Sequence, residues 1–132
     1  MKIGVISTGQ IDEDKRFIEA AEEKGHDITI LELIKCSLSV CQDSADVFYE
    51  GKSIGQTFDI IIPRLNVSFT LFGLAVLRQF QAMNVYVTDT AYSIELGRDK
   101  LRCLQYLLRQ EIPFPTTGFA YSKDDFENSM KT

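Results

Sequence analysis

The stretch Phe58-Asp59-Ile60-Ile61-Ile62-Pro63-Arg64 holds three consecutive isoleucines between an acidic residue and a proline. Such an apolar run is typical of a strand buried on both faces, as in a parallel sheet with helices on each side. Pro63 has no backbone N–H for the sheet ladder, so we expect the strand to end there. Arg64 would then follow the carboxyl end of a central strand, where open α/β sheets bind ligands. The alternative is that Arg64 is an ordinary solvated loop residue.

The residues before this strand predict the start of an α/β fold. Lys2 to Ser7 has the pattern of a first buried strand, and we expect a helix from Asp12 to Lys24. Asp12 is a good N-cap, and Gly25 is a natural left-handed helix end. A second strand around residues 28–31 completes a βαβ-type unit.

Two segments next to the central strand have distinct patterns. In residues 36–57, apolar side chains alternate with serines, which predicts a hairpin insertion that turns near Glu50-Gly51-Lys52. After the strand, Asn66-Val67-Ser68 can cap a helix over about 69–83. Apolar residues at helical spacing predict that this helix is deeply buried: Phe69, Phe72, Val76, Phe80 and Met83.

The remaining residues predict a strand at 85–88, a short helix through Leu96, and a last strand from Thr116 to Tyr121. Between them, Gly97-Arg98-Asp99-Lys100 is expected to open a helix that runs to about Gln110, with Asp99 as a residue that caps or orients. A further helix start is expected at Ser122. We therefore expect one domain over residues 1–132, with a Rossmann-like, open, mainly parallel sheet and helices on both faces. The hairpin insertion at about 36–57 would be an addition to it.

Composition excludes several classes of function. The longest apolar runs are far below the roughly 20 residues of a membrane span. No signal-peptide pattern follows Met1. Three cysteines, an odd and sparse set, indicate reduced thiols in a cytoplasmic protein. The single histidine, His26, argues against a histidine-based metal site and against a Ser/His/Asp triad.

The charge distribution argues against nucleic acid as a partner. Residues 1–59 carry six Lys/Arg and twelve Asp/Glu, whereas residues 60–112 carry six and four. An acidic half does not attract nucleic acid. The basic residues of the second half could converge on an anionic ligand, or several could lie on the solvated faces of helices.

The turn Ser7-Thr8-Gly9-Gln10 lies between a strand and a helix, where phosphate-binding loops are found. It matches neither G-x-G-x-x-G nor G-x-x-x-x-G-K-[ST], so it carries no nucleotide fingerprint. Its backbone amides, near a helix start, could still bind a carboxylate or phosphate. A receiver-type signalling domain is disfavoured, because Pro63-Arg64 stands where that chemistry needs an aspartate.

Several motifs follow one another in the order and spacing found in RimK-type ATP-grasp ligases. They are Tyr49 with Gly51-Lys52, Ile61-Ile62-Pro63-Arg64, Phe72-Gly73 to Leu77-Arg78-Gln79-Phe80, Arg98-Asp99-Lys100-Leu101 to Gln105, Arg109-Gln110-Glu111-Ile112-Pro113, Pro115-Thr116-Thr117-Gly118, and Ser122 with Asp124-Asp125. Each motif alone is weakly specific, but their common order over nearly the whole chain is strongly specific. The chain resembles the amino-terminal, pre-ATP-grasp domain of this family.

The resemblance implies a part in an ATP-dependent carboxylate–amine ligase that adds glutamate, or a similar amino acid, to the carboxyl terminus of a peptide or protein. In RimK the acceptor is a ribosomal protein. The intact ligase would use ATP and Mg²⁺, and the resemblance also implies a homo-oligomer. The catalytic ATP-grasp domain would begin after Thr132, so this chain alone is expected to be inactive, to bind neither cofactor and to hold no catalytic or metal-ligating residue.

The resemblance also assigns site residues. Lys100 resembles the lysine of the Asp-Lys pair that approaches nucleotide phosphates in ATP-grasp enzymes, where fixed cations stabilise developing charge. Arg64 is the candidate for holding the substrate carboxylate, because a guanidinium fork matches that planar group. Ser7, Asn66 and Ser68 are expected at the same sheet edge and could complete the substrate side.

Two rival functions stay open at this point. The chain could be a non-catalytic α/β ligand-binding or dimerisation module that kept the fold without the ligase. It could also be a generic domain that binds an unrelated metabolite. The segment Asn66-Val67-Ser68-Phe69 differs from the small residues that usually follow Pro-Arg in RimK-like chains, which leaves the acceptor open.

Overall fold

The structure is a computed structural model that describes residues 1–9, 11–122 and 125–126. The chain divides into two compact units, Met1–Glu95 and Leu96–Thr132. The first unit contains both sheets, and the second contains the last helix. The expected single domain over residues 1–132 stays a prediction.

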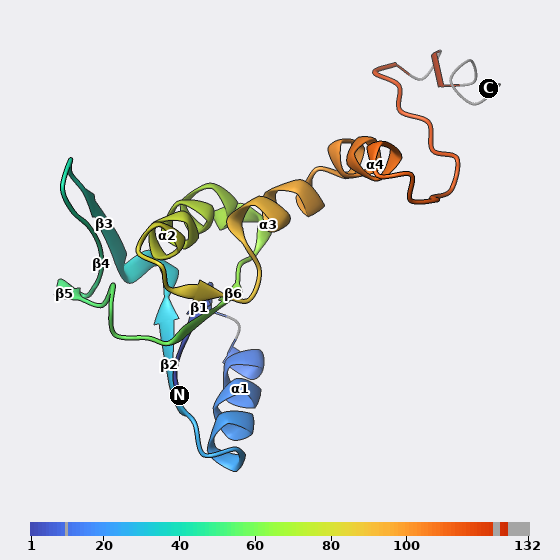
Figure 1. The fold of residues 1–132 in the computed structure, drawn as a ribbon. Coiled ribbons are helices and arrows are strands. Elements are labelled where there is room, and N and C mark those ends of the chain that lie inside the picture. The colour runs from blue at the N-terminus through green and yellow to red at the C-terminus, as the bar shows by residue number, and fades with distance from the viewer. Residues whose placement is uncertain (10, 123–124, 127–132) are drawn as a thin grey trace. The chain divides into compact units, whose positions relative to one another are not determined.

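The first unit is built on a four-stranded parallel sheet, in the order β2-β1-β6-β7 (Figure 1). Its strands are β1 (Lys2–Ser7), β2 (Asp27–Glu32), β6 (Ile60–Arg64) and β7 (Tyr86–Val87). The helices of this unit are α1 (Ile11–Glu23), α2 (Thr70–Ala82) and the start of α3 (Ala91–Arg98). The predicted α/β class with a mainly parallel sheet is confirmed.

Alternation along β1 shows that the sheet is covered on both faces. The Ser7 hydroxyl bonds to Asp14 of α1, so Ser7 and the residues two and four before it face that helix. Ile6 faces the other way, into a buried cluster with residues of α2. Ile3 and Val5 are 7% and 0% exposed, which fits a strand that is shielded from solvent on both faces.

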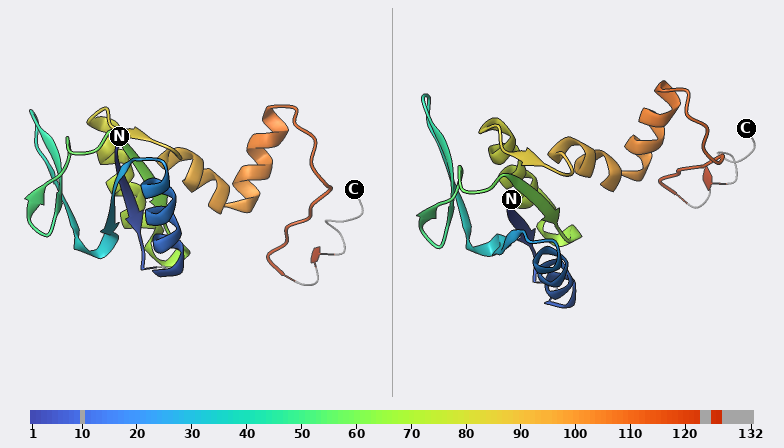
Figure 2. Two further views of the ribbon diagram at one scale, coloured as in Figure 1. Left: turned by 90° about the horizontal axis from the view of Figure 1, so that it is seen from below. Right: turned by 60° about the horizontal axis from the view of Figure 1, so that its bottom comes forward.

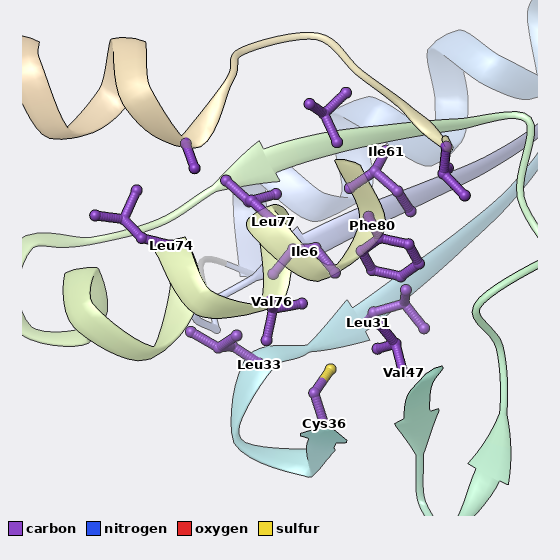
Figure 3. Close-up of a cluster of buried hydrophobic side chains, with 13 residues drawn as sticks. Ile6, Leu31, Leu33, Cys36, Val47, Ile61, Leu74, Val76, Leu77 and Phe80 are labelled. Atoms are coloured by element: carbon purple, nitrogen blue, oxygen red, sulfur yellow. The ribbon is translucent and has the colours of Figure 1, made fainter. Parts of the chain in front are cut away.

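The core lies between the sheet and α2. Phe80 of α2 is fully buried and lies between Ile61 of β6 and Leu31 of β2 (Figure 3). Val76 and Leu77 of the same helix are also fully buried. Burial of side chains of this size stabilises the fold by about 1.5–3 kcal/mol each.

The central strand does not end at Pro63, as the sequence predicted. It continues to Arg64, and Pro63 pairs in register with Ile6 of β1. The Ile61 carbonyl accepts from the Thr88 N–H, so by alternation the backbone of residue 63 also points toward the β7 side. Because β7 pairs only with Ile60 and Ile61, the N–H that proline lacks has no ladder partner to lose.

The predicted buried stripe of α2 is correct only in its later turns. Phe69 and Phe72, both expected in the core, are 38% and 40% exposed. They lie in the 3₁₀ turn Val67–Phe69 and the first turn of α2, at the edge of the sheet. The helical spacing is the same there, but the sheet no longer lies beneath it.

Residues 36–53 form a separate antiparallel sheet that projects from the parallel one (Figure 2). Its strands are β3 (Cys36–Val40), β4 (Ala45–Tyr49) and β5 (Lys52–Ser53). The turn expected near Glu50-Gly51-Lys52 joins β4 to β5, and Glu50 and Gly51 both have positive φ, as a tight hairpin turn requires. A second turn, over Cys41–Ser44, joins β3 to β4 and was not predicted.

The second unit contains α4 (Lys100–Arg109). The Asp99 side chain accepts from the Arg102 N–H at 2.9 Å and caps this helix, as the sequence predicted. The expected strand from Thr116 to Tyr121 is wrong: these residues form neither strand nor helix. A strand needs a partner for its ladder, and the described part of this unit contains no other strand. The helix expected from Ser122 lies partly outside the described residues.

Gln79 ties the hairpin sheet to α2. Its side chain is 8% exposed, and Nε2 donates to the carbonyls of Ser39 (2.8 Å) and Asp46 (3.3 Å). We predict that Gln79→Leu lowers the free energy of unfolding by about 1–3 kcal/mol, because two backbone carbonyls lose a donor in a part-buried contact. Urea unfolding measures this change. The exposed Gln42→Leu at the hairpin tip is the control, and an equal loss there would contradict the assigned contact.

The cysteines of the hairpin sheet differ in environment. Burial raises the pKa of Cys36 to about 11, whereas hydrogen bonds from the Ser44 hydroxyl and the backbone of Asp43 and Ser44 lower the pKa of the exposed Cys41. We predict that iodoacetamide labels Cys41 well before Cys36 at neutral pH, as followed by mass spectrometry, because the thiolate is the reactive form. Equal labelling of the folded protein would contradict this.

The same burial predicts how Cys36 affects stability. Its folded-state pKa lies above the ordinary value, so the unfolded chain releases this proton first, and Cys36 contributes a loss of stability as pH rises from about 9 to 11. Comparison with Cys36→Ser over this range isolates the effect, since the variant lacks a group that titrates there. A pH dependence that is unchanged by the substitution would contradict it.

Candidate functional site

The candidate site lies at the carboxyl edge of the parallel sheet. Ser7 ends β1 and Arg64 ends β6, and the two residues are register partners. Because both strands run the same way, the turn after Ser7 and the segment after Arg64 leave the sheet side by side. This is the edge at which α/β sheets bind ligands.

The turn after β1 is held by buried hydrogen bonds. Ser7 is fully buried, and its hydroxyl donates to Asp14 Oδ2 (2.8 Å) and accepts from the Gly9 N–H (3.1 Å). Gly9 has φ of 91°, a conformation that favours glycine. The other carboxylate oxygen, Asp14 Oδ1, is buried with no hydrogen-bond partner in the described chain. Ser7 therefore orders this turn, and its predicted contact with substrate stays a prediction.

Thr8 connects this turn to the segment after β6. Its hydroxyl donates to the Arg64 carbonyl (3.4 Å) and accepts from the Asn66 N–H (3.3 Å). The Asn66 side chain in turn accepts from the Phe69 N–H (3.3 Å) and caps the 3₁₀ turn that leads into α2. The predicted capping role of Asn66 is confirmed. Its role toward substrate stays a prediction, as does that of Ser68, which is exposed in the same 3₁₀ turn.

Arg64 reaches across to α1 and pairs with Glu13. Arg64 Nε donates to Glu13 Oε2 at 3.1 Å, and Nη2 bonds to the same oxygen. The guanidinium also lies 5.9 Å from the centroid of the Phe17 ring, within range of a cation–π contact. Both partners of the ion pair are partly exposed, with side chains 41% and 43% accessible. Arg64 is therefore not a free loop residue, but an oriented cation that solvent reaches.

A pocket of about 390 Å³ opens around this ion pair. Its lining combines two arginines, one carboxylate, one aromatic ring and one methyl group: Glu13, Arg16, Phe17, Ala20 and Arg64. The volume is within the usual range for small-ligand sites. Such a lining suits a small anion with a short hydrocarbon part.

Four of these residues were not predicted as site residues: Glu13, Arg16, Phe17 and Ala20. Residues 13, 16, 17 and 20 lie three or four apart on one face of α1. Helical spacing alone could have grouped them. Nothing in the spacing shows that this face lies beside Arg64, because that depends on how α1 packs on the sheet.

Lys100 lies in the second unit, as the first residue of α4, and it is exposed beside the capping Asp99. An exposed ammonium at a helix start is compatible with a contact to nucleotide phosphate, and the predicted role of Lys100 stays a prediction. Among the described residues, no group of three or more His, Cys, Asp or Glu side chains could hold a metal. No helix in the described part of the chain is long and apolar enough to cross a membrane.

Comparison with known proteins agrees with this architecture. Residues 1–94 match the family model described as the RimK PreATP-grasp domain. The chain belongs to this family. The match covers the parallel sheet, the hairpin sheet and both residues of the Glu13–Arg64 pair.

Relatives match the whole chain. It is 41% identical to a probable alpha-L-glutamate ligase of Hydrogenovibrio crunogenus, over 100% of this chain and 44% of the relative. A protein of the same name from Coxiella burnetii is 40% identical over 99% of this chain and 44% of the relative. This RimK-type chain thus spans less than half the length of these relatives.

A solved structure shows the same fold. The ATP-grasp ligase PsnB, complexed with its minimal precursor, superposes with a TM-score of 0.63 over 87% of this chain and 44% of that chain. The two sequences are only 17% identical, so the likeness concerns the fold.

Removal of the hydroxyl group of Ser7 or of Ser68 tests whether the hydrogen bonds of Ser7 stabilise the turn at the sheet edge. We predict that Ser7→Ala lowers the free energy of unfolding by about 1–3 kcal/mol, because both oxygens of the partly buried Asp14 carboxylate would then lack a donor. Ser68→Ala removes the same atom from an exposed site and should stay within about 0.5 kcal/mol of the unsubstituted chain. Chemical denaturation measures both. Equal effects would show that the Ser7 network does not brace the turn.

Proposed function

We propose that this chain forms the substrate-side domain of an ATP-dependent carboxylate–amine ligase, which adds glutamate or a similar amino acid to a peptide or protein carboxyl terminus. Membership of the RimK pre-ATP-grasp family supports this proposal. So do the names of the relatives that match the whole chain. The remaining length of those relatives leaves room for the catalytic part of such a ligase.

The observation that carries the proposal is the pocket around Arg64. A partly exposed guanidinium stands at the carboxyl edge of the sheet, beside an opening of about 390 Å³. Its planar fork can bind both oxygens of a carboxylate at once. Binding by Arg64 would fix the position of a substrate carboxylate, and positioning is a major part of ligase catalysis.

Mg-ATP would supply the phosphoryl group that makes a carboxylate open to attack by an amine. The contribution of this chain to that step would be Lys100. A fixed ammonium near transferring phosphate oxygens stabilises their charge without the cost of reorganising water. Asp99 would act indirectly, because its side chain caps α4 and so holds the helix start that carries Lys100.

A chimera tests the proposal. This chain replaces the matching region of the Coxiella burnetii relative, and glutamate-dependent ADP release is measured. We predict that Arg64→Ala raises the KM of a carboxylate substrate about fivefold, because an ion pair at this partly exposed guanidinium contributes up to about 1 kcal/mol. Lys100→Ala should lower kcat more than it raises that KM, because its cation acts on developing charge.

Lys52→Ala, in the exposed strand β5 of the hairpin sheet, is the matched control and should change neither constant. The parent ligase is assayed in parallel, and circular dichroism establishes that each chimera is folded. A folded chimera whose turnover and KM are unchanged by both Arg64→Ala and Lys100→Ala would refute the assigned roles. A folded chimera without activity would refute the equivalence of the two domains.

A further inference from the structure

The charges that line the pocket are complementary to those of a free acidic amino acid. Two guanidinium groups, of Arg16 and Arg64, and one carboxylate, of Glu13, surround it. Glutamate carries two carboxylates and one ammonium group, which is the opposite set. Phe17 and Ala20 supply an apolar surface for the hydrocarbon chain between those groups.

Glu13 occupies the position on Arg64 that a ligand carboxylate would take. Nε and Nη2 of Arg64 both bond to one oxygen of Glu13, so an internal carboxylate holds the donors that a substrate carboxylate would use. The pair is partly exposed, with both side chains more than 40% accessible. Exposed pairs of this kind contribute little, so their exchange for another carboxylate would cost at most about fivefold in affinity.

Arg16 supplies the second cation. It is exposed on the same face of α1 and has no ion-pair or hydrogen-bond partner among the residues that the structure describes. A ligand carboxylate at Arg16 would therefore displace no internal partner. The two arginines thus differ: Arg64 is masked by an internal carboxylate, and Arg16 is available.

We infer that this pocket binds free glutamate, with one carboxylate on Arg64, the other on Arg16, and the ammonium group beside the displaced Glu13. This inference rests on the proposed function, because it makes the ligand of the Arg64 pocket the amino acid that is added. Glu13 would have two states: it masks Arg64 in the empty pocket and pairs with the amine of the bound ligand. The two arginines would select a dicarboxylate over its amide.

The first test is a titration of the 132-residue chain, followed by nuclear magnetic resonance, with three probes. L-Glutamate has all three charged groups, L-glutamine lacks the second carboxylate, and N-acetyl-L-glutamate lacks the ammonium group and imitates the end of an acceptor peptide. We expect glutamate to bind with a dissociation constant on the order of millimolar, as suits about ten non-hydrogen atoms in an open pocket. Each of the other probes should bind about fivefold or more weakly.

Three variants assign these preferences to residues. Arg16→Gln should abolish the preference for glutamate over glutamine. Glu13→Gln should abolish the preference for glutamate over N-acetyl-L-glutamate, because it removes both the competitor for Arg64 and the partner of the ammonium group. Lys15→Gln removes a neighbouring cation that does not line the pocket, and both preferences should survive. Spectra of the free variants show whether each is folded.

The outcomes separate this inference from the proposed function. Equal binding of glutamate and glutamine overturns the proposed recognition of glutamate by three charged groups. Equal binding of glutamate and N-acetyl-L-glutamate overturns it too, and indicates that the pocket binds the end of an acceptor peptide instead. Arg64-dependent binding of all three probes would then still support a carboxylate site. Absence of binding by every probe to the folded chain overturns the inference, while the chimera assay judges the ligase role separately.

Discussion

The parallel pairing of β1 with β6 is the constraint on which the site depends. It makes Ser7 and Arg64 register partners, and so places the turn into α1 next to the segment that leads into α2. A slip of one residue would turn Ser7 away from α1, and its hydroxyl would lose the bond to Asp14. The Ser7–Asp14 bond therefore helps to specify the register, and the register specifies which side chains meet at the sheet edge.

Much of the first unit could be predicted because local and non-local signals agreed. The isoleucine run, the cap at Asn66 and the glycine after α1 each have a physical meaning that does not depend on distant residues. The errors arose where residues distant in the sequence determine the structure of a segment. Pro63 lies inside β6 because β7 is short, and Phe69 and Phe72 are exposed because the sheet ends beneath them. A strand at 116–121 was predicted from pattern alone, without a partner strand.

The site shows the same limit. Arg64 was predicted because its position at a strand end has meaning by itself, and Ser7 was placed correctly at the same edge. Glu13, Arg16 and Phe17 could not be assigned, since an acidic, a basic and an aromatic residue on one helical face are compatible with simple solvation and packing. Only the placement of this helical face beside Arg64 turns it into the lining of a pocket.

The adjacent carboxylates of Glu13 and Asp14 on α1 differ in their exposure to solvent. Asp14 points at the sheet, where its Oδ2 accepts from the fully buried Ser7, so moving it would leave the Ser7 hydroxyl without its acceptor. Glu13, about 100° further round the helix, pairs with Arg64 where solvent reaches both groups. Burial thus makes one contact structural, while exposure makes the other exchangeable. The same helix therefore holds the turn after β1 through Asp14 and leaves Arg64 open to a ligand through the exchangeable Glu13.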